Sequence, residues 1–273
     1  MDRTRYLRTS QLAKAAKIHP NTVRLYEKWG YLPPVERDPF NNYRRFTQKH
    51  LDQLLLIRQA LRFTWLSGEV HKTVDAMISL GAQDNLGGAL ELAYKILSQV
   101  QAERAQAEAA VRYLERWVQG VPPDTTTRPL RIGEVARLLH VTIDQLRNWE
   151  RNNLLETPRD PSNGYRLYGP DEIGRLRVIR MLIRSRYSMM SILRMVHKLD
   201  QGETDQLRQA LDTPGTDEDA RYVTDHWQTT LAELEAAAHE LIEEIEGILT
   251  RRKLEEAPSQ PPPNATRKSW ETD

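Results

Sequence analysis

The sequence contains no cysteine in its 273 residues. Without thiols the chain can form no disulfide, no thiolate metal site and no cysteine nucleophile. No apolar run approaches the roughly 20 residues of a membrane span, and the first residues lack the apolar core of a signal peptide. Glycine-rich phosphate loops, catalytic triads and zinc-protease motifs are missing as well. We therefore expect a cytoplasmic protein that is not an enzyme and uses neither metal nor cofactor.

The net charge of +1 conceals a strong segregation of charge. Residues 1–70 carry 13 Lys and Arg against 6 Asp and Glu, and residues 122–199 carry 14 against 8. By contrast, residues 71–121 have a net charge of −1, and residues 200–256 have one of −11. Two basic blocks of net charge +7 and +6 indicate a polyanionic partner.

The two basic blocks repeat one another. The stretch "VRLYE" from Val23 aligns with "LRNWE" from Leu146, and "NNYRRF" from Asn41 aligns with "NGYRLY" from Asn163 once one residue is dropped. A period of about 123 residues is far too long for a solenoid. The repeat therefore indicates a duplicated domain.

Each copy predicts a short helix, a tight turn, a second helix, a hairpin and two further helices. Pro20 and Thr142 mark the starts of the second helices, because proline suits the first helical position and threonine suits the N-cap. Asn163-Gly164 supplies the positive φ that a two-residue hairpin turn needs, and Asn41-Asn42 must do so in the first copy. The further helices are expected at 47–62, 67–80, 170–184 and 188–199.

A long amphipathic helix follows each copy. Apolar residues recur at alternating spacings of four and three over 86–118 and again from Trp227 to Ile248, which is the pattern of a coiled-coil seam. The second helix is rich in glutamate, whereas the first offers basic side chains, so we expect the two to pair with each other. The expected divisions of the chain are a first domain at 1–80, a first coiled-coil helix at 86–118, a linker at 121–129, a second domain at 130–199, a second coiled-coil helix at 220–256 and a disordered tail at 257–273.

A second helix that carries arginine and an aromatic residue, followed by a basic hairpin, is typical of a winged helix-turn-helix that binds DNA. Arginine offers a bidentate donor for guanine or phosphate, and a tyrosine hydroxyl reaches phosphate. The alternative is that these arginines are ordinary surface charges and the aromatic residues belong to the core. The predicted DNA-binding residues are Asn21, Thr22, Arg24, Tyr26, Tyr43, Arg44, Arg45, Thr142, Gln145, Arg147, Trp149, Tyr165 and Arg166.

In these motifs the sequence resembles the MerR family of bacterial transcription regulators, in a tandem arrangement. The family pattern is matched by "TSQLA", "VRLYE", "GYL" and "NNYRRF", and again by "IGEVA", "LRNWE", "NLL" and "NGYRLY". The resemblance implies a mainly α fold with two winged helix-turn-helix domains, each followed by a long coiled-coil helix. Because two chains of the family cross these helices antiparallel, it further implies an intramolecular pseudo-dimer. Such a regulator would bind near-palindromic promoter DNA, distort it, and meet RNA polymerase there.

Departures from the family pattern predict two unequal copies. Lys17 and His140 stand where the family has its turn glycine, and Trp149 in the second copy lacks a tyrosine hydroxyl. Asp144 lies near the start of the second helix of the second copy's helix-turn-helix, the recognition helix, where a carboxylate would repel DNA phosphates. We expect the first copy to be the stronger binder.

Three alternatives remain open at this stage. The chain, which we expect to associate with the nucleoid when it is bound to DNA, could be an architectural protein that organises DNA without switching a gene. It could instead be a ligand-sequestering or partner-docking module that kept the fold, although the retained basic charge argues against this. Finally, two chains could form a true homodimer with four DNA-binding domains in place of a single-chain pseudo-dimer.

Overall fold

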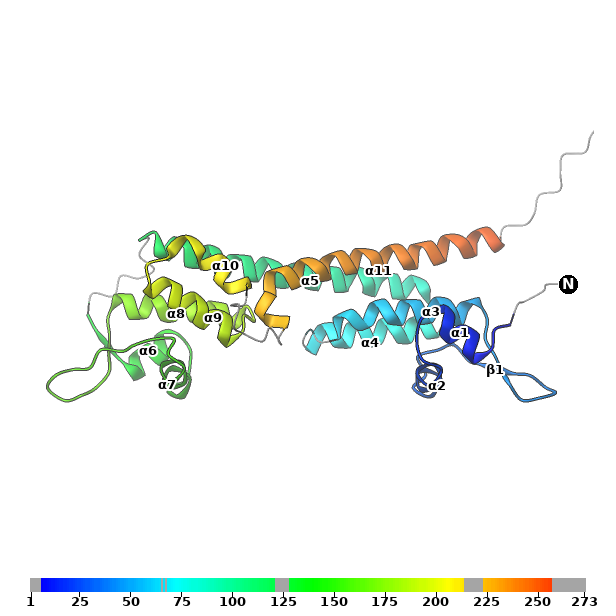
Figure 1. Cartoon of the computed structure of the whole chain (residues 1–273), viewed down its shortest axis with the longest axis horizontal. Coiled ribbons are helices and arrows are strands. Elements are labelled where there is room, and N and C mark those ends of the chain that lie inside the picture. Colours follow the sequence, from blue (N-terminus) through cyan, green and yellow to red (C-terminus); the bar gives the residue numbers. More distant parts are fainter. Residues whose placement is uncertain (1–5, 65, 67, 121–127, 214–222, 257–273) are drawn as a thin grey trace, which may run out of the picture. The chain divides into compact units, whose positions relative to one another are not determined.

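The computed structural model describes residues 6–64, 66, 68–120, 128–213 and 223–256 of a mainly helical protein (Figure 1). Most of the expected linker, the expected tail and the first residues of the expected second coiled-coil helix (121–127, 257–273 and 220–222) lie outside this part of the chain. The chain divides into two compact units, one within residues 1–94 and 240–273 and the other within 95–239. No helix in the described ranges is long and apolar enough to cross a membrane.

Unit one contains the first copy of the repeat, here called the first head. Its elements are α1 (Thr9–Ala15), α2 (Pro20–Lys28), β1 (Glu36–Arg37), β2 (Arg44–Arg45), α3 (Gln48–Ala60), the 3-10 turn η1 (Leu61–Phe63) and α4 (Gly68–Ala82). Strands β1 and β2 pair antiparallel, with Arg37 opposite Arg44. This hairpin is the wing. The unit also holds the first turns of α5 (Leu86–Val118) and the last turns of α11 (Trp227–Glu256).

Unit two contains the second copy, the second head, together with the rest of α5 and α11. Its elements are β3 (Leu130–Arg131), α6 (Ile132–Leu138), α7 (Ile143–Arg151), β4 (Leu167–Tyr168), α8 (Pro170–Arg184), α9 (Met189–Asp200), the 3-10 turn η2 (Thr204–Gln206), α10 (Leu207–Asp212) and the 3-10 turn η3 (Val223–His226). A bridge between Arg159 and Arg166 matches the wing pair Arg37 and Arg44 of the first head. The two heads therefore share their strand pairing as well as their helix order.

The turns of both heads need left-handed backbone at matched positions. Lys17 and His140 have φ values of 55° and 48° in the turn between the two helices of the helix-turn-helix. A residue with a Cβ is strained in this conformation, which glycine adopts freely. The turn nevertheless keeps this geometry with lysine or histidine in place of the family glycine. At the wing, Asn42 and Gly164 have φ values of 59° and 72°. The first wing thus uses asparagine for the positive φ that glycine supplies in the second.

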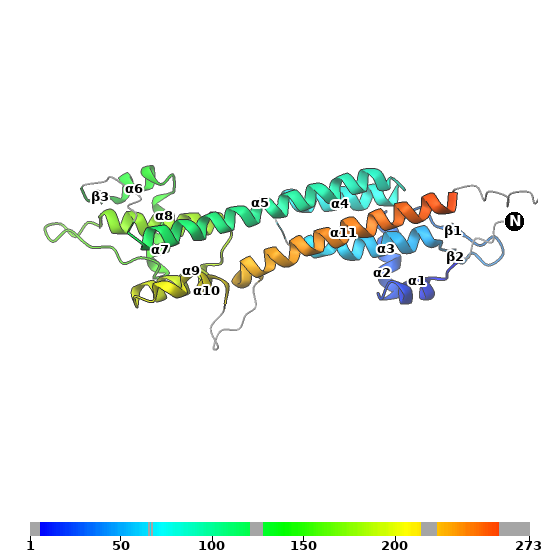
Figure 2. The same ribbon diagram turned by 90° about the horizontal axis from the view of Figure 1, so that it is seen from above.

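In unit one, the last turns of α11 run beside α3 (Figure 2). Arg251 pairs with Asp52 of α3 at 2.7 Å, and the Asp52 side chain is almost fully buried. Arg252 pairs with Asp84, which lies just after α4 and also accepts from Lys49. Charged groups withdrawn from water need partners of opposite sign. These ion pairs therefore hold the end of α11 to the first head.

In unit two, the end of α5 meets the second head by a different contact. Trp117 packs so closely on Gly174 of α8 that a Cβ at position 174 would collide with the indole nitrogen. Position 174 corresponds to Asp52 in the first head. At this position the second head thus packs a tryptophan ring on a glycine, whereas the first head forms a buried ion pair.

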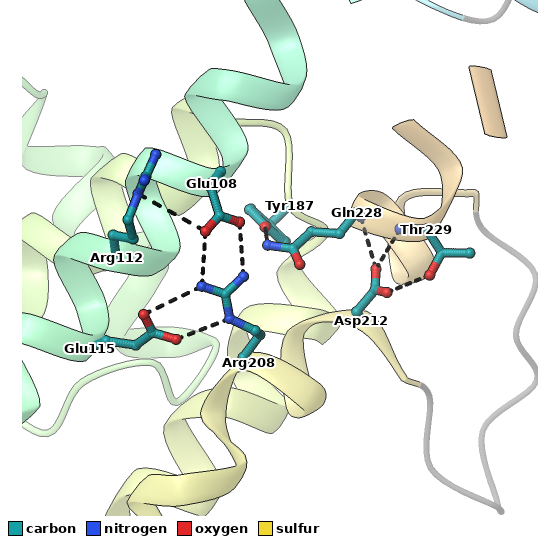
Figure 3. A network of polar contacts seen from close by, with 8 residues as sticks. All are labelled: Glu108, Arg112, Glu115, Tyr187, Arg208, Asp212, Gln228 and Thr229. Carbon is teal, nitrogen blue, oxygen red and sulfur yellow. Dashed lines mark hydrogen bonds and ion pairs between the residues drawn. The ribbon is translucent and has the colours of Figure 1, made fainter. Parts of the chain in front are cut away.

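A polar network joins α10 to α5 and α11 within unit two (Figure 3). Arg208 of α10 donates to Glu108 and Glu115 of α5 at 2.8 and 3.0 Å. Asp212, at the end of the same helix, accepts from the backbone amide of Gln228 at 2.8 Å and from the hydroxyl of Thr229 at 2.6 Å. Among the residues that the structure describes, the first head shows no counterpart of α10, so this attachment distinguishes the second copy.

Candidate nucleic-acid interface

The second helix of each helix-turn-helix starts from a different cap. Thr142 and Gln145 form a capping box at the start of α7, in which the threonine hydroxyl accepts from the Gln145 amide at 3.0 Å. The Gln145 side chain accepts from the Thr142 amide at 2.8 Å. In the first head, His19 takes the cap role and accepts from the Asn21 amide at 3.1 Å. Thr142 and Gln145 thus order the helix start on which the predicted contacts depend.

Arg24 and Arg147 are exposed in the second turns of α2 and α7. The guanidinium of Arg24 donates to the amide oxygen of Asn21 at 3.1 Å. The guanidinium of Arg147 instead pairs with the carboxylate of Asp144 at 3.4 Å. The two arginines occupy matched positions. Arg147 must break its ion pair with Asp144 before it can bind an anion such as a phosphate, whereas Arg24 has no ion pair of this kind to break within the described part of the chain.

A second matched pair of ion pairs fixes each wing to its recognition helix. Arg44 donates to Glu27 at 2.6 Å, and Arg166 donates to Glu150 at the same distance. All four side chains are half-buried. Arg44 and Arg166 therefore set the angle between wing and helix. Arg45 is engaged in a similar way, because its guanidinium holds Asp38 at the base of the wing turn at 2.5 Å.

The structure adds basic residues that sequence reasoning missed. In the second head, a groove of about 620 Å³ lies between the start of α6, the start of α7 and the wing. Five arginines line it: Arg147 and Arg166, which the sequence predicted, and Arg131, Arg137 and Arg159, which it did not. At the matched positions the first head has Arg8, Lys14, Arg24, Arg37 and Arg44. The signal was present in the sequence, because every one of these positions is basic in both copies.

Arg37 and Arg159 show how closely the two wings agree. Each guanidinium donates across its own turn to a backbone carbonyl, that of Asn42 or Gly164, at 3.3 Å. Both arginines are exposed. They present a positive charge at the edge of the wing.

Among the predicted aromatic residues, the structure corrects the role of Trp149. Its side chain is only 4% exposed and packs in the core of the second head, so it cannot present a face to a partner. Its counterpart Tyr26 is half-buried in a ring cluster with Trp29 and Tyr31, and burial raises the pKa of its hydroxyl. Tyr43 and Tyr165 on the wings are exposed.

The acidic residue Glu134 beside the arginine groove is tied to an arginine. Arg128 donates to Glu134 at 2.7 Å and, with the Arg131 amide, lowers the pKa of that carboxyl to about 2. Glu134 lines the arginine groove, so this pairing offsets part of its negative charge.

Among the described residues, no three His, Asp or Glu side chains gather as ligands of a metal ion would.

Comparison with known proteins identifies the family. The family described as "MerR HTH family regulatory protein" matches this chain twice, at residues 7–67 and 130–199. The HTH-type transcriptional regulator CueR of Vibrio cholerae is 31% identical over 117 residues, which are 42% of this chain and 81% of that protein. CueR of Salmonella typhi is 43% identical over 51 residues, 19% of this chain and 36% of that protein.

The HTH-type transcriptional regulator ZntR of Escherichia coli is 36% identical over 62 residues, which cover 23% of this chain and 44% of that protein. No solved structure matches the chain. Most of a CueR protein thus aligns with less than half of this chain, as expected of a duplication. The chain belongs to the MerR HTH family of regulatory proteins, which are DNA-binding transcription regulators and not enzymes.

Proposed function

We propose that this chain is a bacterial, cytoplasmic transcription regulator that brings both heads of a MerR-type dimer to one near-palindromic operator from a single polypeptide. The observation that carries the proposal is the repetition of one constellation in one chain. In both heads the recognition helix carries an exposed arginine. The wing beside it is fixed by a half-buried ion pair, Arg44 to Glu27 in the first head and Arg166 to Glu150 in the second.

The pairing of the two long helices within one chain supports this pseudo-dimer. In unit one, Tyr94 of α5 donates to Glu246 of α11 at 3.0 Å, and Asp84 meets Arg252. In unit two, Gln101 donates to Glu235 at 3.0 Å, and Arg104 pairs with the same carboxylate. Within unit one, residue numbers rise from Asp84 to Tyr94 as they fall from Arg252 to Glu246, which is the order of an antiparallel pair.

The charges on the two helices favour the same pairing. Helix α11 carries acidic side chains along much of its length, so two copies of α11 side by side would place like charges together. Helix α5 supplies Arg104 to this acidic helix within unit two. A single chain can therefore satisfy both helices without a second copy.

On the DNA, Arg24 and Arg147 would read base edges in the major groove, since a guanidinium forks onto the O6 and N7 atoms of guanine. The other basic positions of each head, such as Arg37 and Arg159, would hold phosphates, with Tyr43 and Tyr165 beside them. By similarity to the family, binding would distort the promoter between its half-sites and so change its use by RNA polymerase.

Selection of bound sequences from random duplex DNA with the full chain tests the proposal. We expect a discrete motif of two related half-sites. On the selected operator, Arg24→Ala should relax the base preference in one half-site and Arg147→Ala in the other, each at a cost of about 1–3 kcal/mol. Lys253→Ala is the matched control, because it removes one exposed positive charge from α11 outside both heads. Recovery of no enriched motif, or full affinity of the Arg24→Ala/Arg147→Ala double variant, would overturn the proposal.

A further inference from the structure

The tip of the first wing displays an apolar ring that the fold does not use. Phe40 is 94% exposed, the most of any large hydrophobic side chain that the structure describes. The other two phenylalanines of the chain, Phe46 and Phe63, are fully buried. Exposure of a whole aromatic ring to water is unfavourable. The ring therefore adds no burial to the first head and is available to a partner.

The turn that carries Phe40 is firmly built. The Asp38 carboxylate accepts from the amides of Phe40 and Asn41 at 2.9 and 3.3 Å, and Arg45 holds the same carboxylate from the other side. The amide of Asn42 closes the turn on the Asp38 carbonyl at 2.9 Å. These hydrogen bonds fix the backbone at the tip, so the ring is held out from the wing.

The second wing makes the same turn without an apolar residue. Asp160 accepts from the amide and the hydroxyl of Ser162, the residue matched to Phe40, at 2.9 and 2.6 Å. The amide of Gly164 closes that turn on the Asp160 carbonyl at 2.8 Å. Phenylalanine is thus not required by the turn, and serine at the same place folds back into it.

The surroundings of Phe40 indicate the chemistry of its partner. On the same hairpin Arg37 is exposed and donates to a backbone carbonyl, whereas Arg44 and Arg45 are paired with Glu27 and Asp38. A surface that is apolar at its tip and carries an exposed cation at its flank fits the minor groove of DNA, which offers sugar and base surface between two rows of phosphates. Phenylalanine is one of the side chains that proteins insert there.

We propose that Phe40 enters the minor groove beside the half-site bound by the first head and packs its ring on deoxyribose and base edges. This inference rests on the proposed operator binding and adds an apolar contact that only one half-site receives. The two half-sites then differ in how they are held, and the chain has a preferred orientation on its operator.

The exchange of residues between the two wings tests this contact in the full-length protein. Binding of Phe40→Ser and Ser162→Phe to the selected operator is measured over a range of salt concentrations, with thermal unfolding as a check on the fold. We expect Phe40→Ser to weaken binding roughly tenfold without a change in the log–log salt slope, because an apolar contact releases no counterions. Ser162→Phe should strengthen binding. Arg37→Ala, the ionic control on the same wing, should weaken binding and also reduce the slope.

A fluorescent base analogue beside each half-site reports where the ring lies. With the unmodified protein, we expect a change in emission next to the half-site of the first head, and its loss in Phe40→Ser. Affinity within twofold of the unmodified protein for Phe40→Ser, with unchanged emission, would overturn the inference. That result is distinct from failure of the proposed function, which appears as full affinity of the Arg24→Ala/Arg147→Ala variant.

Discussion

At the scale of single residues, Asn21 and Asp144 occupy matched positions on the two recognition helices and differ in charge. Asn21 leaves the charge of Arg24 uncompensated, whereas Asp144 pairs with Arg147 and adds a carboxylate to the face that would meet phosphates. Two unit charges at 4 Å interact by about 1 kcal/mol in water, which corresponds to roughly a fivefold change in affinity. This difference gives a physical basis for the expectation that the first head binds more strongly.

Asp144→Asn should therefore strengthen binding by the second head several-fold, and Asn21→Asp should weaken binding by the first. Fluorescence anisotropy with operators in which one half-site is scrambled measures each head separately. The salt dependence provides a control, since an effect of charge shrinks as ionic strength rises. A gain of affinity for Asn21→Asp would contradict this assignment of the two faces.

Lys17 and His140 give a prediction for stability. Both occupy left-handed backbone that strains a residue with a Cβ, while glycine adopts it freely. Glycine loses more entropy on folding, so the net stabilisation expected for Lys17→Gly or His140→Gly is about 0.5–1 kcal/mol. Urea unfolding measures it. Both side chains are exposed, and a loss of stability in either variant would show that the side chain makes a contact that matters more than the strain.

At the scale of elements, Asp52 depends on the last turns of α11. The carboxylate is buried, and Arg251 and Arg252 are its cationic partners at 2.7 and 3.8 Å. Removal of the partners of a buried charge is far more costly than removal of the charge itself. The double variant Arg251→Ala/Arg252→Ala should thus lose about 3 kcal/mol of unfolding free energy. In an Asp52→Ala background the same two changes should cost much less, because only the more exposed pair of Arg252 with Asp84 is then lost. Equal losses in both backgrounds would refute the coupling.

The Arg208 network predicts a specific response to acid. Hydrogen bonds from Arg208 hold the pKa of Glu108 below its ordinary value, and Arg104 does the same for Glu235. A carboxyl whose pKa is depressed by folding stabilises the protein above its unfolded pKa, near 4.5, and loses this contribution as pH falls through its folded pKa. The melting temperature of Arg208→Ala should be lower at pH 7 and approach that of the unmodified protein below about pH 4. A constant difference down to acid pH would show that Arg208 acts by packing alone.

Much of the helical framework was predictable because it depends on local patterns. The spacing of apolar residues predicts a helix over 86–118, which is where α5 lies, and proline or threonine marks the starts of α2 and α7. Helix α10 was not predicted, because six residues are too few for a periodic signal. The contact of Trp117 with Gly174 and the pairing of Asp52 with Arg251 join distant parts of the chain, so neither leaves a local signature.

The candidate site was predictable in its positions more than in its roles. Matched residues in the two copies pointed to Arg24, Arg147 and the wings. The packing of the wing on the recognition helix decides which arginines form ion pairs with carboxylates, and sequence does not give that packing. The structure shows these ion pairs for Arg44 and Arg166, which therefore position the wing. The burial of Trp149 likewise follows from the packing of the second head, since aromatic residues serve in cores and in interfaces alike.

At the scale of the whole molecule, simultaneous engagement of both heads predicts a steep salt dependence. Each head offers several exposed basic residues, and together they should neutralise at least about 6 phosphates, with a log–log slope of about −0.9 for each. Titration of the selected operator at several salt concentrations measures the slope. A slope shallower than about −3 would mean that one head remains off the DNA.

The stoichiometry of the complex shows whether one chain carries both halves of the dimer. Light scattering on the free protein, followed by titration of a single operator at concentrations well above the dissociation constant, gives the number of chains in each state. We expect one chain of 31.7 kDa in solution and one chain per operator. Two chains per operator at every concentration would contradict it and establish a homodimer with four heads.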